Sequence, residues 1–238
     1  MLNIDIKVAD LRVVRGGTVV IPQLTISVQR GTVTGLLGPS GCGKSTLIRA
    51  IVGIQATASG TVTVLGGPAG TPETRRRVGY VTQASSIYPD LTVIQNLRYF
   101  ASLAGAPDSA IRQTLSDVGL GDKISALVGN LSGGQRTRVS LAATLLADPA
   151  VYLLDEPTVG LDPILRRDLW QLFDGLAEDG KTLLVSSHVM DEAGRCDRVL
   201  LMREGRILAD ATPDGLRAQT GHHDLEAAFL SLAEGAAA

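Results

Sequence analysis

Residues 38–45, with the sequence GPSGCGKS, have glycines, a lysine and a serine at the spacing G-x-x-x-x-G-K-[ST]. Glycines let a backbone fold closely around an anion, so that successive N–H groups face it. Lys44 adds a mobile positive charge, and the Ser45 hydroxyl is a ligand for Mg²⁺. A strand predicted over 33–37 and a helix predicted over 46–52 flank the run, and this context favours a phosphate-binding loop. We predict nucleotide contacts from Gly38, Pro39, Ser40, Gly41, Cys42, Gly43, Lys44, Ser45 and Thr46.

Two carboxylates, Asp155 and Glu156, follow a second apolar run, VYLL at 151–154. In an α/β sheet, ligands gather at the carboxyl ends of the strands, so the pair is expected beside the phosphate loop. Asp155 is then the candidate Mg²⁺ residue and Glu156 the candidate general base. A solvated turn at Pro157 explains the pair equally well when it is taken alone, and the phosphate loop makes that alternative weaker.

A third motif, LSGGQ at 131–135, precedes a helical sequence. Ser132 is a good helix N-cap, and two glycines allow an anion to approach the positive end of the helix, although a capped helix without a ligand is the alternative. The segment closely resembles the signature sequence of ABC ATPases, and the order and spacing of the three motifs extend the resemblance over nearly the whole chain. The resemblance implies ATP as the nucleotide, Mg²⁺ as the cofactor, and nucleotide contacts from Ser132, Gly133, Gly134 and Gln135.

The same resemblance implies roles for three isolated residues. Gln83 is similar to the glutamine that senses Mg²⁺ and the attacking water, so it is both a catalytic and a metal-site candidate. His188 is similar to the switch histidine that touches the γ-phosphate, and Asp162 lies in a segment similar to the D-loop. The family pattern also implies that two cassettes face each other, so that residues 132–135 of one cover the ATP held by the other. The partner cassette is a second copy or an unlike chain.

One position departs from the family pattern. ABC ATPases commonly place an aromatic residue before the phosphate loop to stack on adenine, and Arg15 stands at that position here. An arginine plane also stacks on a base, but an ordinary surface arginine is an equal alternative. Arg15 is therefore a candidate nucleotide contact that leaves the choice between ATP and GTP open.

Short runs rich in β-branched residues alternate with helical patterns, which predicts an α/β fold with a largely parallel sheet. The resemblance makes this a P-loop NTPase core of the RecA-like type, in one ABC ATPase domain over 1–238. Crowded strand signals at 1–34 and 57–66 predict an additional antiparallel β subdomain. Apolar residues spaced three or four apart predict an inserted helical subdomain at about 87–147, and a helical tail is expected at about 216–238. The strand runs are 18–21, 24–28, 33–37, 61–65, 78–82, 151–154 and 183–186.

The composition of the chain limits which partners and which compartment are expected. Lys and Arg total 22 against 24 for Asp and Glu, so no bulk positive field favours nucleic acid, and none is expected as a partner. The three arginines at 75–77 are expected to form a solvated face. Two distant cysteines suit free thiols in a reducing compartment. No run of about 20 apolar residues is present to span a bilayer. We expect a peripheral protein on the cytoplasmic face of the cell membrane.

The resemblance implies an ATP-hydrolysing subunit that works with separate transmembrane permease subunits, and a stand-alone accessory ATPase is the alternative. Residues 83–88 and the helical block are expected to dock the permease through Ile87 and Tyr88. The segments LTVIQNL at 91–97 and DLEAAFL at 224–230 resemble those of drug-resistance and natural-product exporters. Export is therefore the expected direction, and the cargo is not encoded in the motifs.

Overall fold

A six-stranded sheet forms the centre of the computed structural model, which describes residues 3–84 and 86–235. Its strand order is β10-β9-β3-β8-β7-β6. The pairs from β9 to β6 are parallel, and only β10 runs antiparallel to its neighbour. The strands are β3 (Val33–Leu37), β6 (Val78–Val81), β7 (Val151–Asp155), β8 (Thr182–Ser187), β9 (Arg198–Arg203) and β10 (Arg206–Ala211).

Both faces of this sheet are buried. Because side chains alternate along a strand, Tyr152 and Leu154 of β7 join one core cluster, whereas Val151 and Leu153 join the other. Every residue of β3, β7 and β8 is buried, which is why 151–154 of β7 and 183–185 of β8 read as short continuous apolar runs in the sequence.

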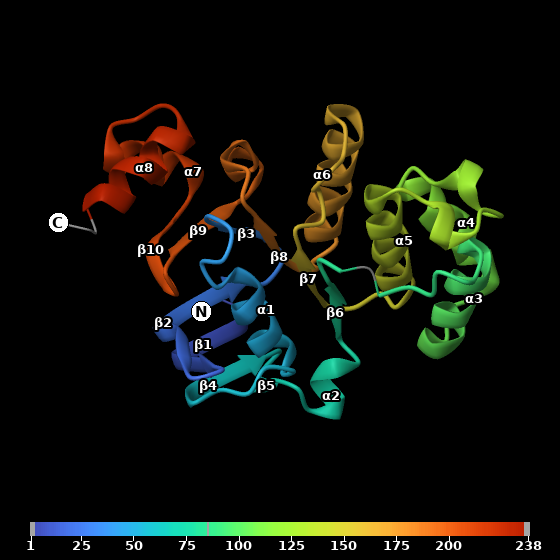
Figure 1. Cartoon of the computed structure of the whole chain (residues 1–238), viewed down its shortest axis with the longest axis horizontal. Coiled ribbons are helices and arrows are strands. Elements are labelled where there is room, and N and C mark those ends of the chain that lie inside the picture. The colour runs from blue at the N-terminus through green and yellow to red at the C-terminus, as the bar shows by residue number, and fades with distance from the viewer. Residues whose placement is uncertain (1–2, 85, 236–238) are drawn as a thin grey trace.

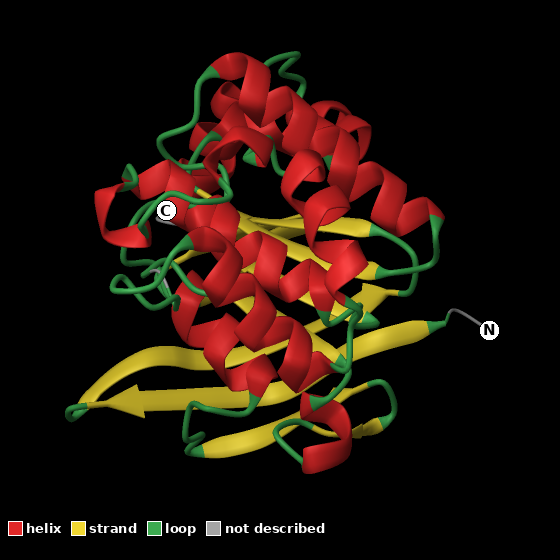
Figure 2. Cartoon of the chain, turned by 90° about the vertical axis from the view of Figure 1, so that its right-hand side faces the viewer, coloured by secondary structure: helices red, strands yellow, loops and turns green. Residues whose placement is uncertain are grey.

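An antiparallel sheet packs beside the parallel one, with the strand order β2-β1-β4-β5. The apolar face of helix α1 (Lys44–Val52) shares a core cluster with strands of both sheets (Figure 1). Figure 2 shows the long strands of the antiparallel sheet lying below the helices. The strands are β1 (Ile4–Arg15), β2 (Thr18–Gln29), β4 (Ser59–Val64) and β5 (Gly67–Pro68), and the short helix α2 (Pro72–Arg75) follows them.

Three helices lie together at the right-hand end of the molecule in Figure 1. They are α3 (Val93–Ala104), α4 (Asp108–Asp117) and α5 (Gly133–Leu146), and two 3-10 turns (Gly121–Lys123 and Val128–Asn130) connect α4 to α5. A capping box between Thr92 and Gln95 starts α3, and Gly105 in the left-handed conformation ends it. These helices fall inside the predicted helical subdomain, whose extent of 87–147 remains a prediction.

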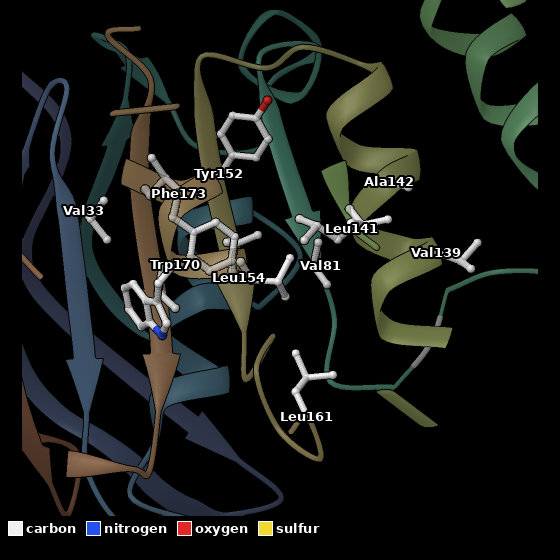
Figure 3. Close-up of a cluster of buried hydrophobic side chains, with 14 of the residues drawn as sticks. Val33, Val81, Val139, Leu141, Ala142, Tyr152, Leu154, Leu161, Trp170 and Phe173 are labelled. Carbon is white, nitrogen blue, oxygen red and sulfur yellow. The ribbon is translucent and has the colours of Figure 1, made fainter. Parts of the chain in front are cut away.

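The second face of the parallel sheet packs against helix α6 (Pro163–Glu178). Trp170 and Phe173 of α6 meet in an edge-to-face contact, with ring centroids 5.6 Å apart, and belong to the same core cluster as Tyr152 and Leu154 (Figure 3). A 3-10 segment, η3 (Met190–Arg195), connects β8 to β9, and the helices α7 (Pro213–Thr220) and α8 (Leu225–Gly235) follow β10. The predicted tail at 216–238 covers these helices in part, and its residues 236–238 lie outside the described chain. Within 3–84 and 86–235, no helix has the length and apolarity that crossing a membrane requires.

The α/β expectation and the antiparallel layer are confirmed. The run at 18–28, predicted as two strands, is one strand, and β9 and β10 were not predicted. Asp210 interrupts the apolar pattern of β10, whereas the apolar run VLLM of β9 at 199–202 was a visible signal that was overlooked.

Candidate functional site

The phosphate loop connects the central strand β3 to helix α1. Gly43 stands at the N-cap of α1 in the left-handed region (φ 112°) and makes no side-chain capping bond. The first N–H groups of this helix therefore have no side-chain acceptor at the cap, and the positive end of the helix dipole lies at Lys44. A helix N-terminus of this kind binds anions.

Close approach to the backbone requires glycine at position 38, and the left-handed backbone favours glycine at position 43. A Cβ on Gly38 (φ 158°) would lie 2.1 Å from the Met202 carbonyl oxygen, and one on Gly43 would lie 2.9 Å from Met202 Cε. Any side chain at Gly38 would therefore push the loop away from β9.

Lys44 is folded back into the loop. Its Nζ donates to the carbonyl oxygens of Gly38 (2.6 Å) and Pro39 (3.1 Å), and it lies 4.0 Å from Glu156 Oε1. The side chain is 4% exposed, so its positive charge is directed into the site rather than into solvent. A buried ammonium group whose partners among the described residues are two carbonyls and a nearby carboxylate is well placed to meet phosphate oxygens.

Asp155 and Glu156 end strand β7, and Ser186 of the neighbouring β8 joins them. The buried Ser186 hydroxyl donates to Asp155 Oδ1 (2.7 Å) and accepts the Glu156 backbone N–H (3.0 Å). The second oxygen, Asp155 Oδ2, is buried and has no hydrogen-bond partner among the described residues. A free carboxylate oxygen in a buried position matches the oxygen ligands that Mg²⁺ prefers, so the residues present fit a magnesium site.

The strand order explains how distant residues converge on Glu156. Strands β6, β7 and β8 are adjacent and parallel, so the residues that follow them meet at one edge of the sheet. Gln83 Nε2 donates to Glu156 Oε2 (3.2 Å), and His188 Nδ1 lies 3.4 Å from Glu156 Oε1. Glu156 itself has a positive φ of 55°, which is uncommon for a non-glycine residue and marks a constrained backbone.

A cavity of about 450 Å³ opens over these groups. Arg15 lines it, and the side chain of this arginine is exposed. The lining residues are Arg15, Val20, Ser40, Gly41, Gly43, Lys44, Ser45, Thr46, Arg49, Gln83 and Glu156.

The signature segment lines a second cavity of about 560 Å³. Ser132 and Gln135 close a capping box, in which Ser132 N–H donates to Gln135 Oε1 (2.9 Å) and Gln135 N–H donates to Ser132 Oγ (3.2 Å). The two cavities share Gln83 and Glu156 but not the phosphate loop. The second cavity is lined by Gln83, Ala84, Ser132, Gly133, Gly134, Arg136, Thr137, Glu156, Val159 and Gly160.

The remaining predicted residues do not line the first cavity. The Cys42 side chain packs in the core cluster of the antiparallel sheet, and burial raises the pKa of its thiol against the lowering effect of Lys44. The Asp162 carboxylate caps α6 by accepting the N–H groups of Ile164 and Leu165, both at 3.0 Å. Asp155 and His188 reach the site through their contacts with Ser186 and Glu156.

One expectation is wrong, and one residue was missed. Ile87 is 8% exposed and belongs to the core, because its side chain packs under the helical block, so only Tyr88 (47% exposed) is available as a surface anchor. Ser186 was not predicted to act at the site, although a pair of serines ending an apolar run was a visible signal. The arginines at 75–77 are exposed, as expected of a solvated face.

Comparison with known proteins agrees with this geometry. The family profile described as ABC transporter matches residues 21–159. The chain belongs to the ABC transporter family. The Nod factor export ATP-binding protein I of Burkholderia lata is 40% identical over 221 residues, which cover 90% of this chain and 70% of that protein. A probable multidrug ABC transporter ATP-binding protein of Escherichia coli, YbhF, is 37% identical over 220 residues. These residues cover 88% of this chain but only 38% of the length of YbhF.

Solved ABC structures are similar over nearly the whole chain. A structure titled as the ATP-binding subunit of an ABC transporter superposes with a TM-score of 0.87 at 29% identity, covering 96% of this chain and 99% of that one. The cbiO1 protein of Clostridium perfringens, described as part of the complex cbiONQ, gives a TM-score of 0.79 at 28% identity, covering 91% of this chain and 92% of that one. The chain is accordingly an ATP-binding, ATP-hydrolysing subunit with the ABC ATPase architecture.

Proposed function

We propose that this subunit pairs with a second cassette around two Mg-ATP and drives export through separate transmembrane subunits, at the cytoplasmic face of a membrane. One observation carries the proposal. The N-termini of α1 and α5 line two different cavities, and of these two cavities only the first contains the phosphate loop. A symmetric pair gives the second helix start its anion, because the signature of one cassette then closes over the nucleotide of the other.

The residues near the first cavity share three tasks in this proposal: proton removal, phosphate binding and magnesium binding. Glu156 removes a proton from the attacking water, and Gln83 and His188, both in contact with its carboxylate, hold that carboxylate in position. Lys44 and the loop amides bind the phosphates. Ser45, Asp155 and Gln83 would hold Mg²⁺, which when bound neutralises charge on the phosphate oxygens.

Arg15 is proposed to contact the base, since it lines the cavity that contains the phosphate loop. A guanidinium plane stacks on any base without reading its hydrogen-bonding edge. We therefore expect weaker discrimination between ATP and GTP than a specific pocket would give.

The permease is proposed to dock on an aromatic surface formed by Tyr88, Tyr99 and Phe100. Tyr88 and Tyr99 are both exposed, with ring centroids 5.3 Å apart, and Phe100 packs beside them. The buried Asn96 holds the Tyr88 segment on α3 by accepting the Tyr88 N–H (2.8 Å) and donating to its carbonyl (3.0 Å). Exposed aromatic residues on a rigid element are typical anchors of protein interfaces.

The direction of transport rests on the relatives. One is named for Nod factor export and another for multidrug transport, and the chain shares 40% and 37% identity with them. Export of a substrate selected by the membrane partner is the proposal that fits both names.

The test uses Glu156→Gln, which keeps the shape of the side chain but removes the base. Turnover should fall by orders of magnitude, while ATP binding persists because the phosphate loop is intact. Size-exclusion chromatography with light scattering should then find a monomer without nucleotide, a dimer with Mg-ATP and a monomer with Mg-ADP. Lys44→Ala should abolish turnover and weaken ATP binding, and Ser132→Arg added to Glu156→Gln should abolish the dimer without preventing ATP binding.

One result would overturn the assigned base, and another would overturn the symmetric pair. Wild-type hydrolysis by Glu156→Gln would exclude it as the base. A variant that binds ATP but remains monomeric would exclude pairing between copies of this chain and would require an unlike partner cassette.

A further inference from the structure

Glu192 is a buried carboxylate with an unusual environment. It is 3% exposed, and neither of its oxygens accepts a hydrogen bond from the described residues. Its ion-pair partner is Arg166 of α6, with Nε 3.7 Å from Glu192 Oε1. A carboxylate placed in the interior is unfavourable unless a positive charge compensates it, so this pair constrains the two segments that carry its members.

The arginine end of the pair leads to the signature segment. Arg166 Nη2 donates to the Leu161 carbonyl oxygen (3.3 Å), so one guanidinium binds both Glu192 and the segment before α6. The Leu161 side chain lies directly on Gly134, since a Cβ on that glycine would be 2.9 Å from Leu161 Cδ2. Leu161 therefore connects Arg166 to the signature segment.

The glutamate end leads to the catalytic cluster. Glu192 lies on η3, and its N–H donates to the Val189 carbonyl oxygen (3.2 Å), while the Val189 N–H donates to Ser187 Oγ (3.0 Å). His188 stands between these two residues and lies 3.4 Å from Glu156. The short turn that presents His188 is thus tied to the Glu192 backbone.

We propose that Arg166 and Glu192 are positioning residues that link the two half-sites of one chain: the His188–Glu156 cluster, which acts on its own nucleotide, and the signature segment, which covers the nucleotide of the paired cassette. This inference rests on the proposed pairing. The extent of the guanidinium is essential, because Nη2 donates to the Leu161 carbonyl oxygen while the positive charge at Nε faces Glu192. A movement of Leu161 on pairing is then transmitted to η3 and to His188.

Two variants distinguish a connection between the half-sites through Arg166 and Glu192, here called the link, from a contact that only stabilises the fold. Arg166→Lys keeps a positive charge beside Glu192, so the fold should be retained, but a single compact ammonium group cannot face Glu192 and donate to the Leu161 carbonyl oxygen at the same time. Glu192→Gln keeps the volume and removes the charge. Arg167→Gln is the matched surface control, since Arg167 lies on the same helix and pairs only with exposed Asp168 among the described residues. Leu176→Ala, on the same helix but distant from the link, is the control for lost stability.

Each change is made in the Glu156→Gln background, and the protein concentration at half-dimerisation is measured in saturating Mg-ATP. We expect Arg166→Lys and Glu192→Gln to raise that concentration about tenfold, as is typical of coupled sites, with monomer affinity for ATP unchanged. Without the Glu156 change, the Hill coefficient of hydrolysis for ATP should fall towards one. The two controls should dimerise like the parent.

The outcomes are distinguishable. If the Glu156→Gln parent dimerises and the link variants dimerise equally well, the link is wrong and the pairing stands. If Leu176→Ala weakens dimerisation as much as Glu192→Gln at the same loss of melting temperature, the pair is merely structural and the inference fails. If the parent itself never dimerises, the proposed pairing fails, and the inference that rests on it fails too.

Discussion

Removing the Ser186 hydroxyl should damage both the stability of the fold and the catalytic cluster. In Ser186→Ala the buried Asp155 carboxylate loses its donor at 2.7 Å, and the Glu156 N–H loses its acceptor at 3.0 Å. A hydrogen bond to a charged group contributes about 1.5–3 kcal/mol, and a buried amide left without a partner costs about 1–3 kcal/mol. Because the two losses are not additive, we expect the free energy of unfolding to fall by about 3 kcal/mol.

That loss corresponds to a melting temperature lower by about 6–12 °C for a chain of this size. The single tryptophan, Trp170, is buried in the core and reports unfolding in urea by its fluorescence. Turnover should also fall about tenfold or more, because the carboxylates at the end of β7 are no longer held in place.

Thr34→Val is the matched control. Thr34 lies on the neighbouring strand β3, and its buried hydroxyl has no hydrogen-bond partner among the described residues. Replacing an unsatisfied hydroxyl by a methyl group of similar size should leave stability unchanged to within about 0.5 kcal/mol, or increase it. A Ser186→Ala protein as stable and as active as wild type would refute the assigned role of the hydroxyl, and equal losses in both variants would show only that this sheet tolerates no change.

Two further outcomes are expected. Tyr88→Glu should uncouple transport and leave hydrolysis by the isolated chain largely unchanged, whereas Leu230→Glu, which changes an exposed apolar residue on α8, should affect neither; normal transport by Tyr88→Glu would place the docking surface elsewhere. Because burial raises the pKa of the Cys42 thiol, the reactive thiolate forms at higher pH in the folded chain than in urea. Maleimide labelling of Cys42, followed by peptide mass spectrometry, should therefore start to rise at higher pH in the native protein, and identical pH profiles would contradict this.

The local motifs were predictable because their physics is local. The phosphate loop and the capping box of Ser132 and Gln135 each lie within one short segment, in which glycines, a cap and a helix start determine the geometry. The strands β7 and β8 were also recognisable, since burial on both faces favours short continuous apolar runs.

Other features depend on which elements become neighbours. Gln83 meets Glu156 across 73 positions of sequence, and this contact exists only because β6 pairs with β7. Ser186 joins Asp155 for the same reason, through the pairing of β8 with β7. Periodicity indicates that a strand exists but not which strand lies beside it, so neither contact could be derived without the family resemblance.

The sequence by itself determined that this chain binds nucleotide phosphates, through contiguous residues that build an anion site from backbone amides and one lysine. Only the tertiary structure decided which side chains face that site and which face the core. Cys42, inside the loop, turns into the core, and Ile87 is covered by the helical block. The ion pair between partly exposed Arg166 and buried Glu192 likewise joins two segments, α6 and η3, that are far apart in the sequence. The direction in which a side chain points and the extent of its burial follow from long-range packing, which no single segment of the sequence determines.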